Sequence, residues 1–405
     1  MPKKCLVFEA YPFFSGMERI TLNVCKILRA KGYEVTLLLA DDRYGTLKEN
    51  FEPHVKEIKN IKVDPFLLKY GDEDSWFGKK TIFRAVIIGL IPFYLRAIKT
   101  INTGQYDYLY CCDPRGATMM FLPALFFKKK SILHYHGKNR LPALLAKMYL
   151  KVYDKVLCVS QDVADSLPPS KNKTVVYNGI DFLQYENVDA SAAANEAAAV
   201  TGQANENSVN FLYAGLLRPH KGLHHLLPAF ARLVKASKNG KKPVLFICGA
   251  AKLPAEITYR DNLITYCRAQ GVEQNIFWLG WKNNVLAWMK FADYLVFPTI
   301  DKELNNYEGF GKVIESSEGL PTVLIESSIC NLYSIAADVT GVKEIITEGV
   351  NGTIFKNGNS EGLYNALSNV MTNRPVIAGF PGGNNFSLNV FEEKILDAFT
   401  DDKGN

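Results

Sequence analysis

Two glutamates, eight positions apart, are the residues of this chain whose spacing best fits a ligand site. Glu318 precedes the segment from Thr322, which we expect to be a helix, and Glu326 lies about one turn inside it. Carboxylates placed in this way can face one crevice and accept paired hydrogen bonds from vicinal hydroxyl groups. With Thr322 as the expected N-cap, the free N–H groups of the first turn can bind phosphate or hydroxyl oxygens. Two ordinary glutamates are the alternative, because spacing alone does not separate the two cases.

A basic turn is the second candidate site. Arg218 and Lys221 lie between an expected strand, 210–214, and an expected helix, 223–234. Open α/β sheets bind ligands at the carboxyl ends of their strands, which is where this turn falls. Guanidinium and ammonium groups at that position suit a pyrophosphate. A solvated basic turn is the competing interpretation.

Gly16 stands at the end of the first expected strand, 4–9, where a helix begins. A glycine lets the backbone approach a ligand, and the start of a helix favours an anion; an ordinary turn is the alternative. The segment lacks the G-x-G-x-x-G pattern, so a nicotinamide or flavin cofactor is disfavoured.

His136 ends the expected strand 130–135 and is followed by a glycine. Its imidazole can donate a hydrogen bond to a hydroxyl or phosphate group near neutral pH. A purely structural histidine is also consistent with this position. We assign His134 to the other side of the strand and to a structural role.

Short β-type runs alternate with helical patterns in both halves, which predicts an α/β protein with parallel sheets covered by helices. The expected strands are 4–9, 34–39, 106–111, 130–135 and 155–159 in the first half, and 210–214, 243–248, 275–279, 294–297 and 333–336 in the second.

The same patterns divide the chain into domains. We place one Rossmann-like domain at 1–188 and a second at 208–385. Between them, 189–207 is rich in Ala, Asn and Ser without apolar periodicity, so we expect a linker or surface insertion. Residues 386–405 resume an amphipathic helix.

The composition is that of a globular protein, with 48% apolar and 22% charged residues. The N-terminal apolar run is too short for a signal peptide. The eight cysteines form no C-x2-C pair, which favours buried free thiols in a reduced cytoplasmic protein over a disulfide framework. No cluster of zinc ligands is apparent, and we interpret the acidic run Asp72–Asp74 as a solvated loop. We therefore expect no zinc site and no nicotinamide or flavin cofactor.

Charge is unevenly distributed along the chain. Residues 1–190 contain 28 lysines and arginines against 20 aspartates and glutamates, whereas 191–405 contain 19 against 21. A basic first half suggests an anionic partner, such as phospholipid or a lipid-linked pyrophosphate, although a mildly basic protein without one is equally consistent. Nucleic acid is the least expected partner, because the cations do not interleave with aromatic residues as in a known module.

Two apolar stretches with cationic flanks, 79–99 and 121–130, bear on the same question. They are too short to cross a bilayer. They can lie in its interface with their lysines and arginines reaching the headgroups. Helices buried against a sheet are the slightly favoured alternative.

Taken in order, these motifs resemble glycosyltransferase family 4, whose members are retaining enzymes with the GT-B fold. The similarity is clearest over 318–355, which carries the E-x7-E motif, and extends to 159–181 and to the turn 215–222. The resemblance implies two Rossmann-like domains facing across a cleft, with the C-terminal helix returning to the N-terminal domain.

The resemblance also implies roles for individual residues. Glu326 would bind the ribose of a donor nucleotide, Lys221 the pyrophosphate, and Glu318 the transferred sugar. The catalytic residues implied are His136, Arg218, Lys221 and Glu318. The donor-binding residues implied are Gly16, Arg218, Lys221, Glu318, Gly319, Leu320, Thr322, Val323 and Glu326. The arginine usual in the family is Leu216 here, so Arg218 is expected to replace it.

The activity implied is metal-independent transfer of a hexose, with retention, from a UDP- or GDP-sugar. The acceptor would be a hydroxyl of a glycan or lipid-linked molecule in cell-surface polysaccharide or glycolipid synthesis. The location implied is cytoplasmic, with peripheral attachment to the inner face of the membrane. A nucleotide-sugar epimerase of GT-B type and a non-catalytic binding protein remain alternatives. The stretch 299–317 is longer than usual for the family and is expected to be an insertion.

Overall fold

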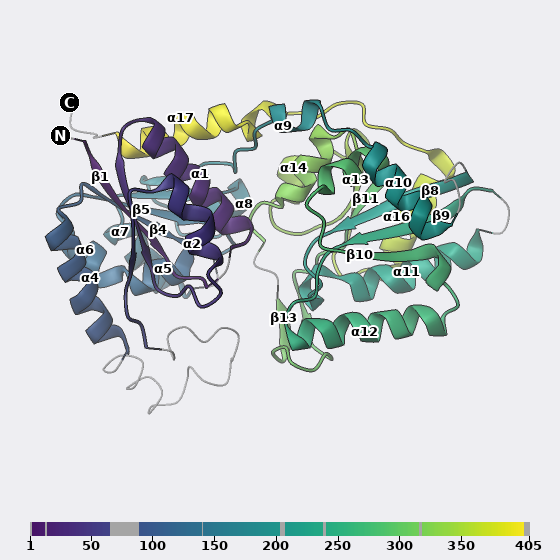
Figure 1. Ribbon diagram of the computed structural model, residues 1–405, viewed down its shortest axis with the longest axis horizontal. Helices are drawn as coiled ribbons and strands as arrows, with labels where there is room; N and C mark the ends of the chain where they lie inside the picture. The colour runs from purple at the N-terminus through teal and green to yellow at the C-terminus, as the bar shows by residue number, and fades with distance from the viewer. Residues whose placement is uncertain are drawn as a thin grey trace. The chain divides into compact units, whose positions relative to one another are not determined.

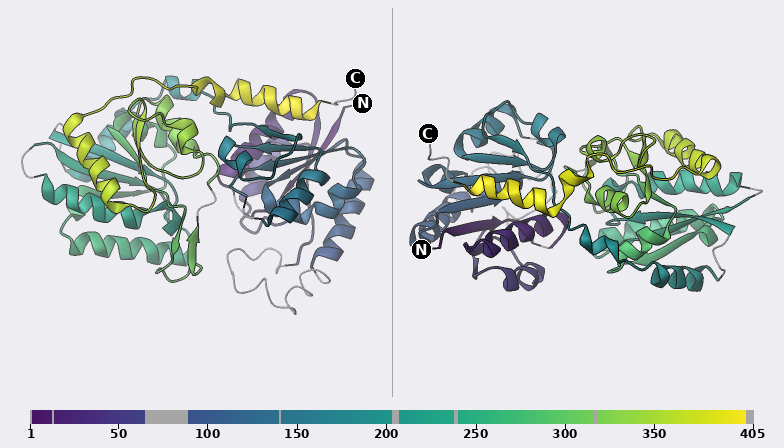
Figure 2. Two further views of the ribbon diagram at one scale, coloured as in Figure 1. Left: turned by 180° about the vertical axis from the view of Figure 1, so that it is seen from behind. Right: turned by 90° about the horizontal axis from the view of Figure 1, so that it is seen from above.

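The computed structural model describes residues 2–12, 14–64, 89–139, 141–202, 207–237, 240–315 and 318–400. The chain forms two compact units (Figures 1 and 2). The first unit contains Met1–Gly179 together with Asn385–Asn405, and the second contains Ile180–Asn384. The acidic run 72–74 and the first half of the apolar stretch 79–99 lie outside the described residues.

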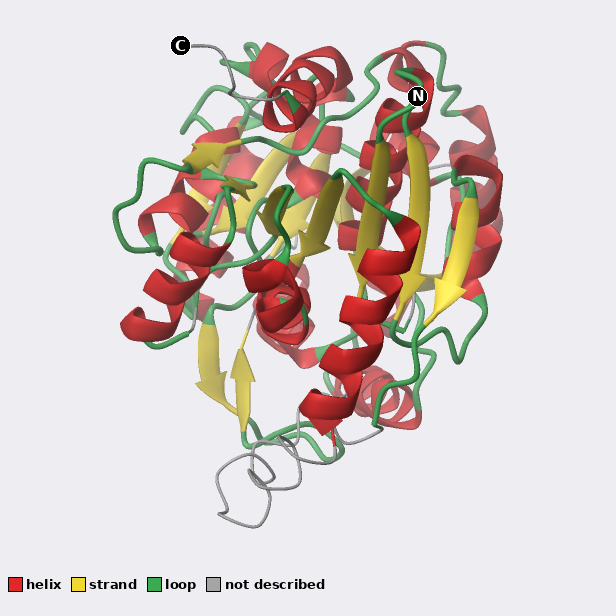
Figure 3. Cartoon of the chain, turned by 90° about the vertical axis from the view of Figure 1, so that its left-hand side faces the viewer, coloured by secondary structure: helices red, strands yellow, loops and turns green. Residues whose placement is uncertain are grey.

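The first unit is built on a seven-stranded parallel sheet in the order β3-β2-β1-β4-β5-β6-β7. Its strands are β1 Lys4–Glu9, β2 Glu34–Leu39, β3 Glu57–Asn60, β4 Tyr108–Cys112, β5 Lys130–Tyr135, β6 Lys155–Cys158 and β7 Lys173–Val175. Its helices are α1 Gly16–Ala30, α2 Thr46–Phe51, η1 Glu52–His54, α4 Ile91–Gly104, α5 Asp113–Met119, α6 Phe121–Phe126, α7 Ala143–Val152, α8 Gln161–Asp165 and α17 Leu388–Phe399. These helices cover the parallel strands (Figure 3).

Helix α17 closes the core of the first unit although it is the last element of the chain. It packs against α1 (Figure 1). The Phe399 ring lies 5.1 Å from that of Tyr108 and 6.1 Å from that of Tyr33. Phe391, Ile395 and Phe399 are at most 1% exposed, at the spacing of one helix face. The expected return of the C-terminal helix to the N-terminal domain is therefore confirmed.

The second unit is built on a six-stranded parallel sheet in the order β10-β9-β8-β11-β14-β15. Its strands are β8 Ser208–Ala214, β9 Lys242–Cys248, β10 Ile276–Gly280, β11 Tyr294–Phe297, β14 Tyr333–Ala337 and β15 Gly352–Phe355. Its helices are α9 Leu183–Glu186, α10 Ser191–Thr201, η6 Pro219–Lys221, α11 Leu223–Ala236, α12 Pro254–Ala269, η7 Glu273–Asn275, α13 Val285–Phe291, α14 Thr322–Ile329, α15 Val342–Ile345 and α16 Ser360–Asn373. The short helix η8, Gly383–Phe386, ends at the start of the return to the first unit.

The segment 189–207, expected to be a linker or surface insertion, contains a helix that its composition did not predict. Residues Ser191–Thr201 form helix α10, which packs on α13 with Ala193 and Ala197 fully buried. An ion pair between Lys282 and Glu196 joins α10 to the turn before α13. Alanine is the best helix former, and a small residue at i and i+4 makes a packing face that has no large apolar residue.

The expected insertion at 299–317 forms a small antiparallel hairpin. It consists of β12, Lys302–Leu304, and β13, Val313–Glu315, in a sheet separate from the two parallel ones. The loop between the strands packs against α12: the Tyr307 ring lies 4.9 Å from that of Tyr259, and a Cβ on Gly309 would lie 2.6 Å from the Cβ of Ala255. The hairpin is therefore an ordered part of the second unit over its described residues.

Candidate functional site

The order of the second sheet defines where a ligand can bind. From β8 the chain continues to β9 on one side and returns to β11 on the other. The carboxyl ends of β8 and β11 therefore flank a topological switch point, where open α/β sheets bind their ligands. The basic turn follows β8, and the segment leading to Glu318 follows β11.

The structure brings Lys221 and Glu318 together at this switch point. The Lys221 ammonium forms an ion pair with a carboxylate oxygen of Glu318, and the two side chains are 20% and 17% exposed. Ninety-seven positions separate these residues in the sequence. At the carboxyl end of the sheet, the half-buried ammonium can bind a phosphate, and the half-buried carboxylate can accept a hydrogen bond from a hydroxyl.

Glycines allow the two segments to approach this closely. Gly222 has a φ of 75°, and a Cβ there would lie 1.9 Å from the carbonyl oxygen of Pro298, which follows β11. Gly341 has a φ of 79°, and its Cβ would lie 2.5 Å from the carbonyl oxygen of Gly319. Any side chain at either position would push the basic turn or the Glu318 segment away from its neighbour.

The helix after Glu318 begins at Thr322 itself, whereas Thr322 as the N-cap would place its first residue at position 323. Pro321 is the N-cap of α14 and Thr322 is its first helical residue, so the predicted capping role of Thr322 is wrong. Proline has no N–H to satisfy and holds an extended conformation, which suits the residue before the first turn. Gly319 and Leu320 are buried in the turn, whereas Thr322, Val323 and Glu326 are half-buried.

Arg218 does not share the Lys221–Glu318 contact. Its Nε donates to Oε1 of Glu256 at 2.6 Å. Glu256 is 3% exposed, and its other oxygen accepts the backbone N–H groups of Lys252 and Leu253 at the start of α12. The guanidinium expected to replace the family's arginine is thus tied to a buried carboxylate on a neighbouring helix, and sequence spacing gave no sign of that partner.

Tyr213 is a residue near the site that the sequence analysis missed. Its hydroxyl donates to the carbonyl oxygen of Leu216 at 2.7 Å, which fixes the start of the basic turn. Burial raises the pKa of Tyr213, and the negative charge of Glu318 raises it further. The tyrosine therefore remains a neutral support beneath the turn.

In the first unit, Gly16 is the first residue of α1. The preceding Ser15 donates its backbone N–H at 2.9 Å, and its hydroxyl at 2.5 Å, to the buried Glu18 carboxylate. No atom of the described residues would lie within 4 Å of a Cβ on Gly16. Packing against the described residues therefore does not require a glycine at this position.

His136 follows β5, as predicted, but the assignment of His134 to the opposite side is wrong. The two rings lie 4.2 Å apart, because residues i and i+2 of a strand face the same way. His134 is fully buried, with Nδ1 at 2.6 Å from the Tyr110 hydroxyl, which confirms its structural role. Burial lowers the pKa of His136 to about 3, so its ring is neutral at physiological pH. Its Nε2 has no hydrogen-bond partner among the described residues.

The predicted residues thus fall into two groups. Lys221, Glu318 and Glu326 lie on segments that meet in the second unit, with Arg218 directed to α12, and Gly16 and His136 belong to the first unit. All eight cysteines are buried free thiols, as expected. Within the described part of the chain, the structure also assembles one group of metal-ligating type that the sequence did not reveal, His224, His225 and Glu303.

Comparison with known proteins agrees with the two-unit architecture. Residues 14–182 match the model of Glycosyltransferase Family 4, and residues 196–378 match that of Glycosyl transferases group 1. A UDP-Gal:alpha-D-GlcNAc-diphosphoundecaprenol alpha-1,3-galactosyltransferase of Escherichia coli is 21% identical over 97% of this chain and 95% of its own. An uncharacterized glycosyltransferase of Methanocaldococcus jannaschii is 25% identical over 90% of this chain and 86% of its own.

A solved structure shares the fold along its whole length. Anabaena HepE in complex with UDP and glucose superposes with a TM-score of 0.74 at 18% identity, covering 98% of this chain and 99% of that one. Two parallel α/β units that match this structure along its length define the GT-B fold. Because the two family models together account for residues 14–182 and 196–378, the chain is a glycosyltransferase of the family-4 and group 1 type. Two of its relatives are named as transferases for diphosphoundecaprenol-linked substrates. Among the described helices, none is long and apolar enough to cross a membrane.

Proposed function

We propose that this glycosyltransferase moves a hexose from a UDP- or GDP-sugar to a hydroxyl of a glycan or lipid-linked acceptor, with retention and without a catalytic metal. The observation that supports the proposal most directly is the Lys221–Glu318 pair at the switch point of the second unit. Relatives named as glycosyltransferases that act on diphosphoundecaprenol-linked substrates, and a structural neighbour that binds UDP and glucose, support the same substrate class.

The proposed chemistry assigns a role to each of these groups. The bond between the anomeric carbon and the pyrophosphate oxygen breaks, a bond to the acceptor oxygen forms on the same face, and the acceptor proton leaves with the pyrophosphate. Lys221 stabilises the charge that grows on the leaving group, and the start of α14 adds free N–H groups. Glu318 accepts hydroxyls of the sugar, and Glu326 accepts those of the ribose.

Arg218 enters this scheme as a secondary cation. Because its Nε is bonded to the buried Glu256, part of its charge is already compensated. Lys221 is also paired with a carboxylate, but Glu318 is itself assigned to the sugar, and we therefore give Lys221 the larger share of leaving-group stabilisation. His136, which is neutral, supplies a hydrogen bond to the donor sugar but no charge.

Donor binding and transfer test this proposal together. In a thermal-shift screen of UDP, GDP, ADP and their sugars, we expect a rise in Tm with either the uridine or the guanosine series, because a ligand of the folded state stabilises it by mass action. Replacing Lys221 by Ala should lower kcat by about 100-fold or more, since one group that stabilises transition-state charge is lost. Glu326→Ala should weaken donor binding by about 10- to 100-fold.

Lys235→Ala is the matched control, because this lysine lies at the far end of α11 and bonds Gln270. It should leave donor binding and transfer unchanged. Full activity in both the Lys221 and Glu326 variants would refute the assignment. Conversion of a UDP-sugar to its epimer with no acceptor present, followed by NMR, would instead identify an isomerase.

We further propose that the first unit attaches to an anionic membrane surface. Helix α6 packs against both α4 and α7, so these three helices form one continuous surface. Leu95, Phe126 and Leu144 on them are 67%, 65% and 74% exposed. Exposed lysines accompany them: Lys99 on α4, Lys147 on α7, and Lys128 just after the end of α6. Apolar side chains beside cations suit insertion into the interface of an anionic leaflet, which would present a lipid-linked acceptor.

Flotation with liposomes tests the membrane proposal. We expect the protein to float with vesicles that contain anionic lipid and to be released at high salt. A double change, Leu95→Ser with Phe126→Ser, should weaken binding by about 10-fold or more, since burying each side chain contributes ~1.5–3 kcal/mol. Leu183→Ser, at an apolar side chain of the second unit that is 71% exposed, is the control. Equal flotation of the double variant and the wild type would contradict the proposal.

A further inference from the structure

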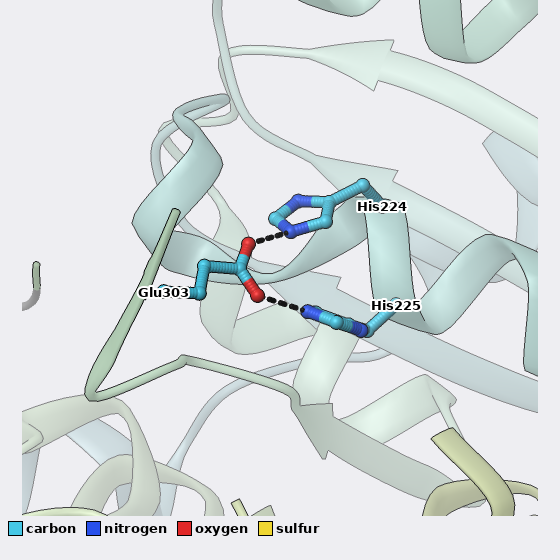
Figure 4. A group of neighbouring side chains, drawn as sticks. All are labelled: His224, His225 and Glu303. Carbon is cyan, nitrogen blue, oxygen red and sulfur yellow. Dashed lines mark hydrogen bonds and ion pairs between the residues drawn. The ribbon is translucent and has the colours of Figure 1, made fainter. Parts of the chain in front are cut away.

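Two consecutive histidines at the start of α11 converge on one carboxylate of the inserted hairpin (Figure 4). Nε2 of His224 lies 2.5 Å from Oε1 of Glu303, and Nε2 of His225 lies 2.7 Å from Oε2 of the same residue. The three ligand atoms lie within 4.8 Å of one another. Both nitrogens and both oxygens therefore point at one small volume.

The far side of each ring is held by another helix. Nδ1 of His224 lies 2.8 Å from the hydroxyl of Tyr259 on α12, and Nδ1 of His225 lies 3.2 Å from the hydroxyl of Ser360 on α16. Tyr259 is 1% exposed and also accepts the backbone N–H of His224 at 3.3 Å. Histidines that ligate metals use the second ring nitrogen in this way, which fixes the orientation of the ring and the position of its proton.

The group is shielded but can be reached from solvent. The side chains of His224, His225 and Glu303 are 9%, 23% and 25% exposed. The ring of Tyr307, from the hairpin loop, lies 5.2 Å from that of His224 and covers one side. Such partial exposure leaves an entry path and room for a water molecule.

We propose that His224, His225 and Glu303 bind one divalent transition-metal ion of the zinc type, through the two Nε2 atoms and a carboxylate oxygen. Two imidazoles with one carboxylate suit zinc, whereas magnesium and calcium prefer oxygen ligands alone. A tetrahedral ion with bonds of about 2.0–2.2 Å separates its ligand atoms by roughly 3.3 Å. The two nitrogen–oxygen contacts, now 2.5 and 2.7 Å, would lengthen by less than about 1 Å to reach that spacing.

The binding chemistry requires a shift of one proton on each ring. With the ion on Nε2, each imidazole carries its N–H on Nδ1 and donates it to the oxygen of Tyr259 or Ser360. Three protein ligands leave a fourth position for water. Among the described residues, no other group of histidine, cysteine and carboxylate side chains offers this arrangement.

The ion would act as a clip between the hairpin and the basic turn. His224 is three residues after Lys221, and Glu303 follows β11 at the start of the insertion. Joining them holds β12 and β13 against the first turn of α11, and so steadies the segment that carries Lys221. The ion supplies no step of sugar transfer, and the site does not depend on the substrate that the enzyme uses.

Zinc titration of chelator-treated full-length protein tests the site. We expect calorimetry to show one zinc ion per chain and thermal melts to show a higher Tm in zinc. Tyr259→Phe removes a partner that supports a ligand, and it should weaken zinc binding by roughly 10- to 100-fold. Glu303→Gln and His225→Gln remove a ligand itself, and each should weaken zinc binding by more than that. Tryptic cleavage at the hairpin, after Lys312, should slow with zinc in the wild type and not in Glu303→Gln.

Glu315→Gln is the matched control within the same hairpin. Glu315 pairs with Lys302 across the two strands, so it shares the face of Lys302 and not that of Glu303. It should bind zinc as tightly as the wild type. Circular dichroism checks the fold of each variant, and His225→Gln replaces Glu303→Gln as the deciding variant if the latter does not fold. Equal zinc affinity in the wild type and the deciding variant, or no zinc binding by the wild type, would overturn the proposal.

Discussion

Single residues with unusual backbone geometry set the position of the candidate donor site. Gly222 joins the basic turn to α11 in a left-handed conformation and leaves no room for a Cβ against Pro298. Lys221, immediately before it, can therefore reach Glu318 from a segment 97 positions away. The reactive side chains are ordinary, and it is the glycine that decides where they meet.

We expect Gly222→Ala to destabilise the second unit and to lower transfer. An alanine in a left-handed conformation costs about 1–2 kcal/mol, and the contact of its Cβ with the Pro298 carbonyl adds to that because a backbone oxygen cannot move aside. The free energy of unfolding in urea measures the loss. Gly271→Ala is the matched control, since Gly271 has a φ of 67° and no described atom within 4 Å of a Cβ. Equal losses in the two variants would show that the clash is unimportant.

At the scale of elements, helix α10 shows how a segment whose buried face has no large apolar residue can belong to a packed domain. Its buried face consists of Ala193 and Ala197, and these small residues let α10 lie close to α13. Exposed residues on its other side, Ala199 among them, face solvent. Close packing of this kind tolerates no increase in volume at the buried positions.

Ala197→Leu should destabilise the protein by about 1–3 kcal/mol, because extra volume is forced into a packed contact. Ala199→Leu, on the exposed face of the same helix, should stay within ~0.5 kcal/mol of the wild type. The free energies of unfolding of the two variants in urea can be compared directly, because both variants replace an alanine of the same helix by leucine. Tolerance of leucine at both positions would mean that α10 does not pack as described.

At the scale of the whole molecule, the chain is not a simple sequence of two domains. It passes from the first unit to the second at Gly179 and returns for its last helix, so the first unit is complete only after the second has been synthesised. The ring of Phe399 fills a space among Tyr33, Tyr108 and Tyr110 that no earlier residue occupies. The stability of the first unit therefore depends on residues at the far end of the sequence.

Phe399→Ala should destabilise the first unit by about 3–5 kcal/mol, because a fully buried ring is replaced by a cavity. Hydrogen exchange should show lost protection in β1 and β4 of the first unit and little change in β8 and β9 of the second. Asn389→Ala, at an exposed position of the same helix, is the control. Protection lost equally in both sheets would contradict the separate stability of the two units.

The sequence by itself determined the elements whose signals are local. Each of the ten expected strands is present, because runs of β-branched, aromatic and other apolar residues mark buried parallel strands within a few positions. The short strands β3, β7 and β15 were not predicted. Glu57–Asn60 and Lys173–Val175 are mostly polar, and strands of three or four residues carry little periodicity. The motif Glu318–Glu326 and the basic turn were also local signals.

Tertiary structure alone decided which of these signals meet. The fold pairs Lys221 with Glu318 and directs Arg218 to Glu256, 38 positions away. The two cations of the basic turn therefore have different partners. The fold also places Glu303 between two histidines 79 and 78 positions before it. Such contacts depend on strand order and on the path of loops, which are set by packing over the whole unit and leave no periodic trace in the sequence.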